Sequence, residues 1–531
     1  MAIHSSSAAP SYADLLALLG HADNLPLLAN LQRGIEKEAL RCTPQGVISQ
    51  TAHPHGLGSA LTHPGITTDY SEALLEFITP VFSSGQEAVA WLDVAHRFAY
   101  SQMPEELIWP ASMPCILQGE MSVPIADYGS SHLGQLKHIY RHGLWHRYGR
   151  VMQCIAGIHY NFSIPSALWP VLQQQLDPQQ TQSLQDFISD RYFGLIRNFR
   201  RYSWLLIYLF GASPAVCSSF LEGRPHQLQT LNKDTLFSPF ATSLRMSDLG
   251  YQNNAQSGLK VCHNSVANYV ETLGQAVRGS VPAYEAIGVQ DENGQYKQLN
   301  TSLLQIENEY YSDIRPKRIA RHGEKPLEAL GRYGVEYIEV RCTDINPFLP
   351  VGIDVPQTAF MDLFLCYCLL KPSANIENDE FDRLQANLKA TVMRGREPGL
   401  ELHDGERSRT LQDWGMALLA EMDDLAGMLD RANHSSFHRD SLGQQRLKLA
   451  DSSRTPSAQV LRALTEGQLE FSELTLQQAQ THRKTLSEPL GAAVMERWTE
   501  LARQSLEQQA MMEANSHGSF ADYLAEYLKR D

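Results

Sequence analysis

Three short segments of this chain alternate polar and apolar residues, and this alternation constrains the fold more than any other feature. Successive side chains of a β-strand point to opposite faces, so polar residues two positions apart share one face. Residues 34–38, 155–163 and 335–341 therefore predict strands with a polar face. The predicted same-face pairs are Glu36 with Glu38, His159 with Asn161, and Glu339 with Arg341.

The second segment shows the pattern most clearly. Ile158, Tyr160 and Phe162 are predicted to pack into a core, while His159 and Asn161 face a cavity or solvent. Oxygen ligands together with one imidazole on a rigid sheet suit hard divalent cations, and such cations commonly serve phosphate chemistry.

The composition is that of an ordinary globular protein, with 43% hydrophobic and 19% charged residues. The 531 residues are enough for a large core and, by length, for two or more domains. A formal charge of -15 argues against a nucleic-acid-binding protein. A polyanionic substrate would therefore need metals or a few placed arginines to balance its charge.

Nothing at the start of the chain has the pattern of a secretory signal, because residues 1–12 contain neither a positive nor an apolar segment. The longest apolar run, residues 204–217, is too short for a membrane span. The eight cysteines form no C-x-x-C pair, which favours reduced thiols packed in a core. We expect a cytoplasmic protein with no membrane or nucleic-acid partner.

The chain is predicted to have two parts. Residues 34–370 mix strand-like alternation, aromatic-rich helical segments such as residues 192–210, and glycine and proline turns, as in an α+β domain. After residues 371–375 the pattern becomes helical, with many Gln and Glu residues. We predict a catalytic α+β domain over residues 1–370 and a mainly helical region over residues 371–531 that packs on it.

Each acidic candidate also has a simpler structural interpretation. Alternating Glu36 and Glu38 could form a solvated strand face. Asp69 and Glu72 could be a helix cap and its capping-box partner. Glu76 is harder to explain without a cation, because an apolar residue stands on each side of it in an apolar run.

The other candidate residues and segments also have both a structural and a functional interpretation. His159 could be a hydrogen-bonded core histidine. Glu339 and Arg341 could form a salt-bridged face, or Glu339 could hold a metal while Arg341 holds a phosphate. Three polar and aromatic segments could be substrate-binding walls, or else an amphipathic helix with a basic face and two exposed loops. These segments are residues 138–150, 240–251 and 304–318.

The sequence contains no Gly-x-x-x-x-Gly-Lys-Ser/Thr loop, no Gly-x-Gly-x-x-Gly turn behind a predicted strand and no Gly-x-Ser-x-Gly elbow. Any nucleotide is therefore bound neither by a Walker loop nor by a dinucleotide fold.

A series of ordered blocks, among them Gly157-Ile158-His159-Tyr160-Asn161-Phe162-Ser163, closely resembles the proteobacterial glutamate-cysteine ligase family. The likeness is dense from about residue 30 to residue 370, persists through residues 394–400 and weakens over the helical tail. The blocks are residues 34–38, 58–63, 66–69, 73–80, 109–115, 157–163, 209–214, 241–251, 305–318 and 336–347.

The resemblance implies a fold like that of glutamine synthetase, in which an antiparallel sheet forms a funnel around ATP and several Mg²⁺ ions, with Mn²⁺ as a possible substitute. It also implies a reaction. ATP phosphorylates the γ-carboxylate of L-glutamate, and the amine of L-cysteine then displaces phosphate to give γ-glutamylcysteine, the first step of glutathione synthesis. Feedback inhibition by glutathione is a further expectation, and we expect a monomer. Nothing after residue 370 resembles an ATP-grasp module, so glycine addition is expected from another enzyme.

The resemblance also implies roles for single residues. The implied metal ligands are Glu36, Glu38, Asp69, Glu76, His159 and Glu339. Arg141 and Arg341 resemble the arginines that face the transferred phosphate, and are the candidate catalytic residues. The implied wall around the cysteine substrate is Tyr140, Leu144, Gln153, Arg245, Tyr251 and Tyr311, with Asn161 on the glutamate side. Neither a general base for the amine nor an adenine pocket is assigned.

Two other functions are consistent with the same residues. A metal-dependent phosphohydrolase would use the carboxylates to activate water and would hydrolyse ATP or an ester without any amino acid. A nucleotide- or amino-acid-sensing module would bind its ligand without turnover.

Overall fold

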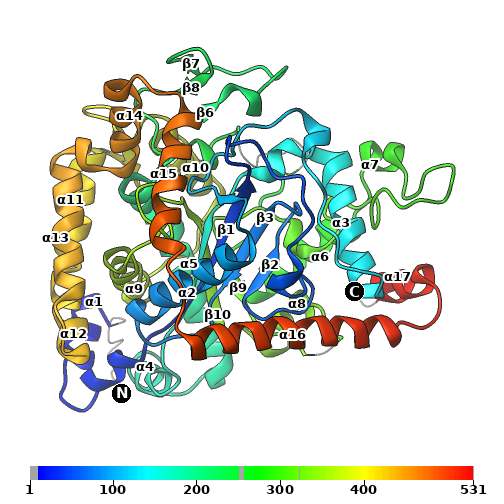
Figure 1. Cartoon of the computed structure of the whole chain (residues 1–531). Coiled ribbons are helices and arrows are strands. Elements are labelled where there is room, and N and C mark those ends of the chain that lie inside the picture. Colours follow the sequence, from blue (N-terminus) through cyan, green and yellow to red (C-terminus); the bar gives the residue numbers. More distant parts are fainter. Residues whose placement is uncertain (1–9, 250–255, 257, 322, 530–531) are drawn as a thin grey trace, which may run out of the picture.

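The centre of the molecule is a seven-stranded antiparallel sheet (Figure 1), in a computed structural model that describes residues 10–249, 256, 258–321 and 323–529. The strand order is β2-β3-β1-β5-β10-β9, and β4 pairs with the end of β1. A three-stranded sheet, β6-β8-β7, and a hairpin, β11-β12, are separate. The strands are β1 (Gln32–Cys42), β2 (Ile66–Thr68), β3 (Leu74–Ile78), β4 (Leu107–Ile108), β5 (Ile158–Ser163), β6 (Ala215–Cys217), β7 (Gln229–Thr230), β8 (Thr235–Phe237), β9 (Ile314–Lys317), β10 (Tyr337–Thr343), β11 (Glu401–Asp404) and β12 (Arg407–Thr410).

Helices surround this sheet and form all but one hairpin of the described C-terminal region. They are α1 (Tyr12–Leu19), α2 (Gly85–Gln102), α3 (His132–Tyr148), α4 (Leu168–Leu176), α5 (Leu184–Phe210), α6 (Val266–Arg278), α7 (Pro282–Ile287), α8 (Pro326–Tyr333), α9 (Val355–Leu370), α10 (Asn378–Arg394), α11 (Leu411–Glu421), α12 (Asp423–Asn433), α13 (Phe437–Ala450), α14 (Pro456–Gly467), α15 (Phe471–Leu486), α16 (Ala492–Ala514) and α17 (Phe520–Lys529).

The register of the central strands gathers the polar side chains on one face of the sheet. On β1, Glu36 lies opposite His159 of β5, and Glu38 lies opposite Glu76 of β3. Strand β10 pairs with the other edge of β5 and adds Glu339 to the same face. Residues directly opposite one another in a ladder share a face, so the three predicted polar strands form one surface.

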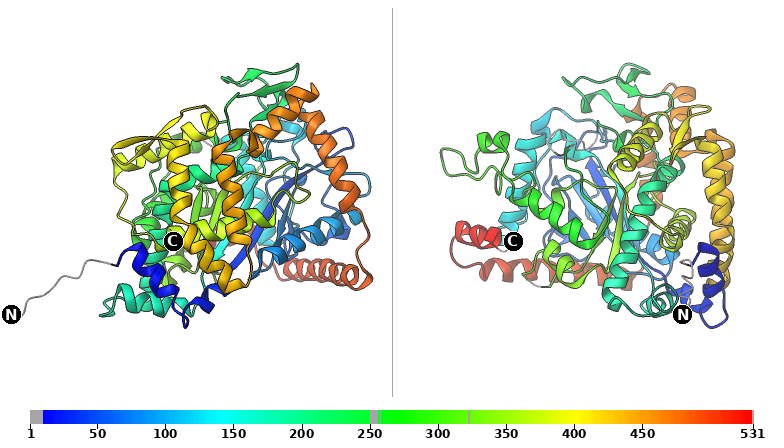
Figure 2. Two further views of the ribbon diagram at one scale, coloured as in Figure 1. Left: turned by 90° about the vertical axis from the view of Figure 1, so that its left-hand side faces the viewer. Right: turned by 180° about the vertical axis from the view of Figure 1, so that it is seen from behind.

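The opposite face of the sheet is apolar and packs on α2, α5 and α9 (Figures 1 and 2). Ile158, Tyr160 and Phe162 are all buried there, as the alternation predicted. Lys37 is a polar residue on this apolar face. It is 1% exposed, and its Nζ lies 2.6 Å from Nε2 of His96 on α2.

The predicted fold class is confirmed. The chain is α+β, with an antiparallel sheet and a helical C-terminal layer, and the predicted helix over residues 192–210 is the greater part of α5. The β11-β12 hairpin was not predicted, because its two strands are short and mainly polar. One cluster of buried apolar side chains extends from Leu15 to Ala502 and includes residues of both predicted parts. The division at residue 370 stays a prediction.

The last two helices hold the loops that lead into the sheet and into α3. Along α16, Ser505 Oγ accepts a hydrogen bond of 2.9 Å from the backbone N–H of Ser59, and Glu513 Oε1 accepts one of 2.9 Å from that of Ser130. Leu524 of α17 is buried against the outer side of α3. Figure 1 shows α16 running below the sheet and α17 beside α3.

The sequence also predicted that the chain has neither a membrane-spanning helix nor a disulfide framework. None of the helices in the described part of the chain is both long and apolar enough to cross a membrane. The eight cysteines are all unpaired, and all except the half-buried Cys262 are buried, as expected for reduced thiols in a core.

Candidate active site

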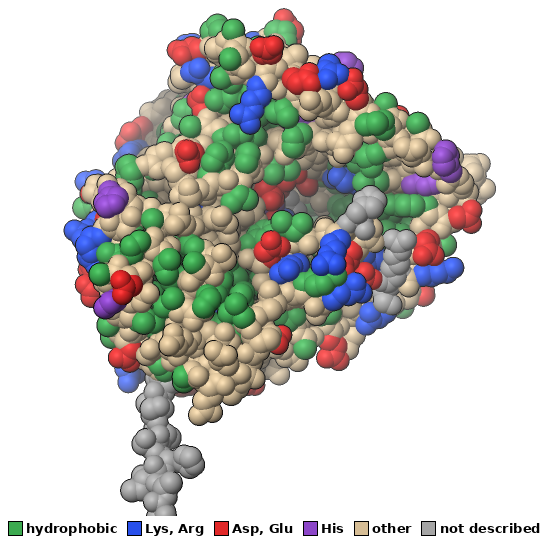
Figure 3. Space-filling model, turned by 90° about the horizontal axis from the view of Figure 1, so that it is seen from below, with side chains coloured by type: hydrophobic (Ala, Val, Ile, Leu, Met, Phe, Trp, Pro, Cys, Tyr) green, Lys and Arg blue, Asp and Glu red, His purple; other side chains and the backbone are tan. Residues whose placement is uncertain are grey.

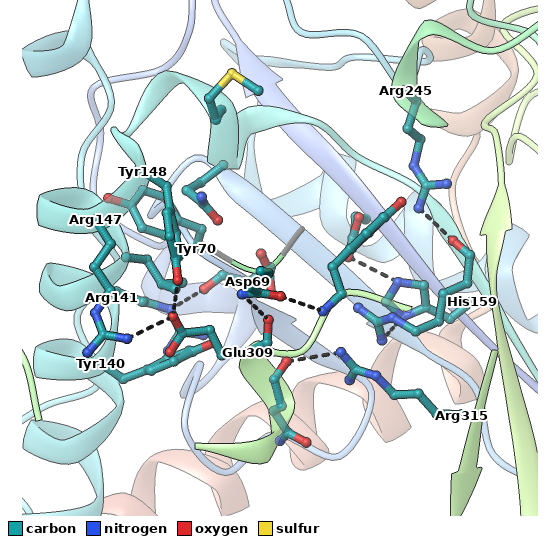
Figure 4. Close-up of a pocket in the computed structure, with 18 residues that line it drawn as sticks. Asp69, Tyr70, Tyr140, Arg141, Arg147, Tyr148, His159, Arg245, Glu309 and Arg315 are labelled. Carbon is teal, nitrogen blue, oxygen red and sulfur yellow. Dashed lines mark hydrogen bonds and ion pairs between the residues drawn. The ribbon is translucent and has the colours of Figure 1, made fainter. Parts of the chain in front are cut away.

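A cavity of about 350 Å³ lies between α3 and the polar face of the sheet. The space-filling view from below shows a hollow with acidic side chains inside it (Figure 3). Helix α3 forms one side, strands of the central sheet form the other, and several segments between these elements close the remainder (Figure 4). The cavity is lined by Glu38, Asp69, Tyr70, Tyr140, Arg141, Leu144, Arg147, Tyr148, Met152, Gln153, His159, Arg245, Gln256, Asn308, Glu309, Tyr311, Arg315 and Arg341.

Helix α3 is amphipathic and supplies one wall of the cavity, so the helical interpretation is correct for residues 138–148, and a role of this segment in binding substrate stays a prediction. The Ser131 side chain begins the helix by accepting a hydrogen bond from the backbone N–H of Gly134. Leu136 and Ile139 pack against α17 on the outer side. The 3.6-residue period turns five residues toward the cavity. These are Tyr140, Arg141, Leu144, Arg147 and Tyr148.

The base of the cavity holds a cluster of acids around His159. Glu36, Glu76 and His159 each offer a ligand atom, and these three atoms lie within 4.8 Å of one another. His159 Nδ1 is 3.1 Å from Glu36 Oε2 and 3.6 Å from Glu339 Oε1, and its Nε2 is 3.4 Å from Glu38 Oε1. The sheet register therefore brings together residues from four strands, and neither a solvated face nor an isolated core histidine describes them.

The electrostatics of this cluster fit a divalent cation. Burial, followed by the nearby carboxylates of Glu36 and Asp69, raises the pKa of Glu76 well above its usual value. Burial also raises the pKa of Glu38. Asn161 Oδ1 is buried and has no hydrogen-bond partner among the residues that the structure describes. Crowded carboxylates, an imidazole and an unused amide oxygen are the ligands that bind Mg²⁺ or Mn²⁺.

Asp69 lies in the turn between β2 and β3, so the interpretation of Asp69 and Glu72 as a helix cap is wrong. The hairpin is closed by the backbone N–H of Asp69, which donates to the carbonyl of Leu74 at 3.0 Å. The carbonyl of Asp69 accepts a hydrogen bond from Nε of Arg141. This hydrogen bond joins the β2-β3 turn to α3 at the wall of the cavity.

Cationic side chains of β9 and β10 face the acids from the sheet side. Arg341 Nη1 is 2.9 Å from Glu339 Oε1, so the predicted salt bridge is present, and it lies at the cavity. Burial opposes ionisation of Glu339, but Lys317 and Arg341 hold its pKa well below the usual value. Arg315 also lines the cavity, and its Nη2 donates to the carbonyl of Asn308 at 3.0 Å.

The position of Arg245 is set by two neighbours. Its Nη2 donates to the carbonyl of Arg341 at 2.8 Å, and the guanidinium lies against Gly157 so closely that a Cβ at position 157 would overlap it. Buried Asp344 holds the loop before Arg245, because its Oδ1 accepts a hydrogen bond of 2.9 Å from Ser243 Oγ. Its Oδ2 accepts from the backbone N–H of Ala212 at 2.8 Å and from Ser213 Oγ at 2.6 Å.

Most of the predicted site residues meet in this one place. Ten of them line the cavity, namely Glu38, Asp69, Tyr140, Arg141, Leu144, Gln153, His159, Arg245, Tyr311 and Arg341. Glu36, Glu76, Glu339 and Asn161 lie at its base, in contact with one another or with His159. Tyr251 lies outside the described residues. The individual roles stay predictions.

The sequence interpretation missed several lining residues. Buried Glu309 is one of them: its Oε1 accepts a hydrogen bond of 3.1 Å from Arg147 Nη1 and another from the hydroxyl of Tyr148. A signal was available, because these residues belong to segments 138–150 and 304–318, which combine charged and aromatic residues. Tyr70, Met152 and Gln256 carried no such signal.

Comparison with known proteins gives consistent matches. The family model for glutamate-cysteine ligase matches residues 16–391. The chain is 51% identical over 513 residues to the glutamate-cysteine ligase of Pseudomonas putida strain KT2440, with 96% of this chain and 97% of that protein covered. It is 50% identical to the enzyme of Pseudomonas aeruginosa strain PAO1, with coverage of 96% and 97%.

Two solved structures are also similar. One is the glutamate-cysteine ligase of Francisella tularensis in complex with AMP, with a TM-score of 0.87, 37% identity, and 94% of this chain and 98% of that chain covered. The other is a bifunctional glutathione synthetase from Pasteurella multocida, with a TM-score of 0.70 and 27% identity. That match covers 90% of this chain and 55% of the Pasteurella chain.

Proposed function

This chain belongs to the glutamate-cysteine ligase family and catalyses the ATP-dependent formation of γ-glutamylcysteine in glutathione synthesis, and we propose that the cavity between α3 and the sheet is where the reaction takes place. One observation carries the proposal: the ligand atoms of Glu36, Glu76 and His159 meet at the base of a cavity that also holds Arg141 and Arg341. The AMP complex of the Francisella relative supports an adenine nucleotide as the ligand of this fold.

The family uses ATP and a divalent cation, and we propose Mg²⁺, with Mn²⁺ as a possible substitute. A bound cation would neutralise oxygens of the nucleotide polyphosphate. The surplus of carboxylates, seen in the raised pKa of Glu76, supports this assignment. The proposed ligands are Glu36, Glu38, Asp69, Glu76, His159 and Glu339.

The proposed chemistry needs positioning and charge neutralisation more than covalent help. We propose that Arg141 and Arg341 face the phosphoryl group as it passes to the γ-carboxylate of glutamate. The resulting acyl phosphate is sensitive to water, which a walled cavity excludes while the cysteine amine arrives. The proposed wall for cysteine is Tyr140, Leu144, Gln153, Arg245, Tyr251 and Tyr311, with Asn161 toward glutamate.

Removing a metal-site charge tests the location. Glu36→Gln should abolish ADP release with little change in melting temperature, because it removes charge and leaves packing intact. Glu339→Gln should also abolish ADP release, at a lower melting temperature, because it removes the partner of half-buried Arg341. Exposed Glu466→Gln is the matched control. Full activity of both site variants would refute the location. ADP release without glutamate would instead favour a phosphohydrolase, and nucleotide binding without turnover a sensing module.

A second experiment tests the proposed binding site for the cysteine substrate. Arg245→Ala should raise the KM for cysteine far more than the KM for glutamate, because the proposed contact is with cysteine alone. An equal rise in both constants would discard the assignment.

We also propose that the protein acts in the cytoplasm as a monomer, with residues 1–370 as its catalytic domain, and that glutathione inhibits it. Sedimentation gives the oligomeric state, and initial rates with added glutathione give the inhibition.

A further inference from the structure

The side of α3 away from the cavity carries two histidines one helical turn apart. Their Nε2 atoms lie 3.1 Å from each other, and the ring planes are inclined by 62° with centroids 4.7 Å apart. Both side chains are half-buried, and neither His138 nor His142 is among the described residues that line the cavity. Two histidines at i and i+4 share one helix face, which is the spacing at which helices bind zinc.

A backbone contact fixes His138 in the tautomer that a metal requires. Its Nδ1 lies 2.8 Å from the carbonyl oxygen of Ala126. A carbonyl oxygen only accepts, so Nδ1 carries the proton and Nε2 of the neutral ring keeps its lone pair. Metal-binding histidines commonly donate their second ring N–H to a backbone carbonyl in this way.

His142 is held in the neutral form. Burial, and then the neighbouring His138, lower the pKa of His142 to about 4. The imidazole is therefore unprotonated near neutral pH, which is the form that binds metal ions.

The spacing of the two nitrogens suits a metal as well as it suits a hydrogen bond. Two zinc–nitrogen bonds of about 2.0–2.1 Å at a tetrahedral angle place the nitrogens roughly 3.3 Å apart. Within the described residues, the Arg150 guanidinium opposes a cation. It lies 3.9 Å from the ring centroid of Trp145 and helps to lower the pKa of His142. With two protein ligands and this neighbour, binding should be moderate in strength.

We propose that His138 and His142 form a binding site for a transition-metal ion of the zinc type, with water in the remaining coordination positions. The site is separate from the acid cluster, which has the oxygen ligands of a magnesium site. Its metal would link two successive turns of α3, the helix whose other side carries Arg141, and would therefore stabilise that helix.

Equilibrium dialysis of the whole protein against Zn²⁺, with Mg²⁺ in large excess to fill the acid cluster, tests the site. We expect the unmodified protein, exposed His403→Ala and Glu76→Gln to retain one more equivalent of Zn²⁺ than either His138→Ala or His142→Ala. Equal zinc retention by His142→Ala and the unmodified protein would overturn the proposal and leave a simple hydrogen bond between the rings. Loss of the equivalent in Glu76→Gln alone would place the zinc in the acid cluster, and so would also overturn it.

A measurement on the unmodified protein covers the case in which a histidine variant fails to fold. In protein labelled at histidine nitrogen, Zn²⁺ should shift two imidazole signals together, and the melting temperature should rise with zinc concentration by mass action. No paired shift under the same excess of Mg²⁺ would contradict the proposal.

Discussion

Replacing Lys37 with methionine should stabilise the protein and remove part of its pH dependence. Lys37 lies on the apolar face of β1 between two proposed metal ligands and is 1% exposed. Nδ1 of His96 lies 2.7 Å from the carbonyl of Leu92, so its Nε2 is unprotonated and accepts a hydrogen bond from Lys37 Nζ, 2.6 Å away. No acid of the described residues forms an ion pair with this amine, and burial lowers the pKa of Lys37 to about 7.

The magnitude follows from this pKa. The difference between 10.5 in the unfolded chain and about 7 in the folded one corresponds to roughly 5 kcal/mol. Between these pH values the unfolded chain binds the proton and the folded one does not, so stability falls by up to about 1.4 kcal/mol for each pH unit below 10.5. Below about 7 both states are protonated, and the contribution is constant. Methionine removes this penalty but leaves His96 Nε2 without its donor, at about 1–3 kcal/mol, so the net gain at pH 7 is on the order of 2 kcal/mol or more.

Urea unfolding followed by pulse proteolysis at pH 7, 8 and 9 measures the effect. From pH 7 to pH 9 the free energy of unfolding of the unmodified protein should rise by about 2–3 kcal/mol more than that of Lys37→Met. Lys484→Met, at an exposed lysine, should follow the unmodified protein. Parallel pH profiles for Lys37→Met and the unmodified protein would refute the idea that this amine is buried without charge.

The cavity wall and the C-terminal helices give three more tests. Gly157→Ala displaces the Arg245 guanidinium and should lower kcat/KM for cysteine by about 100-fold, with the KM for glutamate nearly unchanged in steady-state assays; an equal effect on both substrates would contradict this. Asp344→Asn weakens the hydrogen bonds that hold the loop before Arg245, so the same constant should fall by about 10-fold, the cost of roughly 1.4 kcal/mol, at a melting temperature close to that of the unmodified protein. Leu524→Asp places a charge between α17 and α3 and should raise the KM for cysteine and speed proteolysis after α16, whereas exposed Leu447→Asp should do neither; unchanged kinetics would show that α17 does not position α3.

The polar face of the sheet was predictable because strand alternation is a local rule. It placed Glu36 with Glu38 and His159 with Asn161 on shared faces without knowledge of the register. Glu76 was identified by a second local signal, an acid within an apolar strand. These residues do meet at one cluster in the structure.

Contacts between segments distant in sequence were not predictable from one chain. The close approach of Arg245 to Gly157 and the salt bridge of Glu309 with Arg147 depend on how loops return to the sheet. Asp69 shows the same limit in a short segment: its spacing from Glu72 suits a helix cap, but pairing with β3 makes a hairpin. Tertiary pairing decided between two local conformations that the sequence left open.

The position of α16 and α17 in the chain has a consequence for biosynthesis. Residues 492–529 are translated after every residue that lines the cavity, yet they supply hydrogen-bond partners for the backbone at Ser59 and Ser130. While these helices are still inside the ribosome, the loop before β2 and the loop before α3 lack those partners. The growing polypeptide can therefore complete these contacts around the cavity only after residues 492–529 have left the ribosome, and a product that ends before residue 492 should consume no ATP.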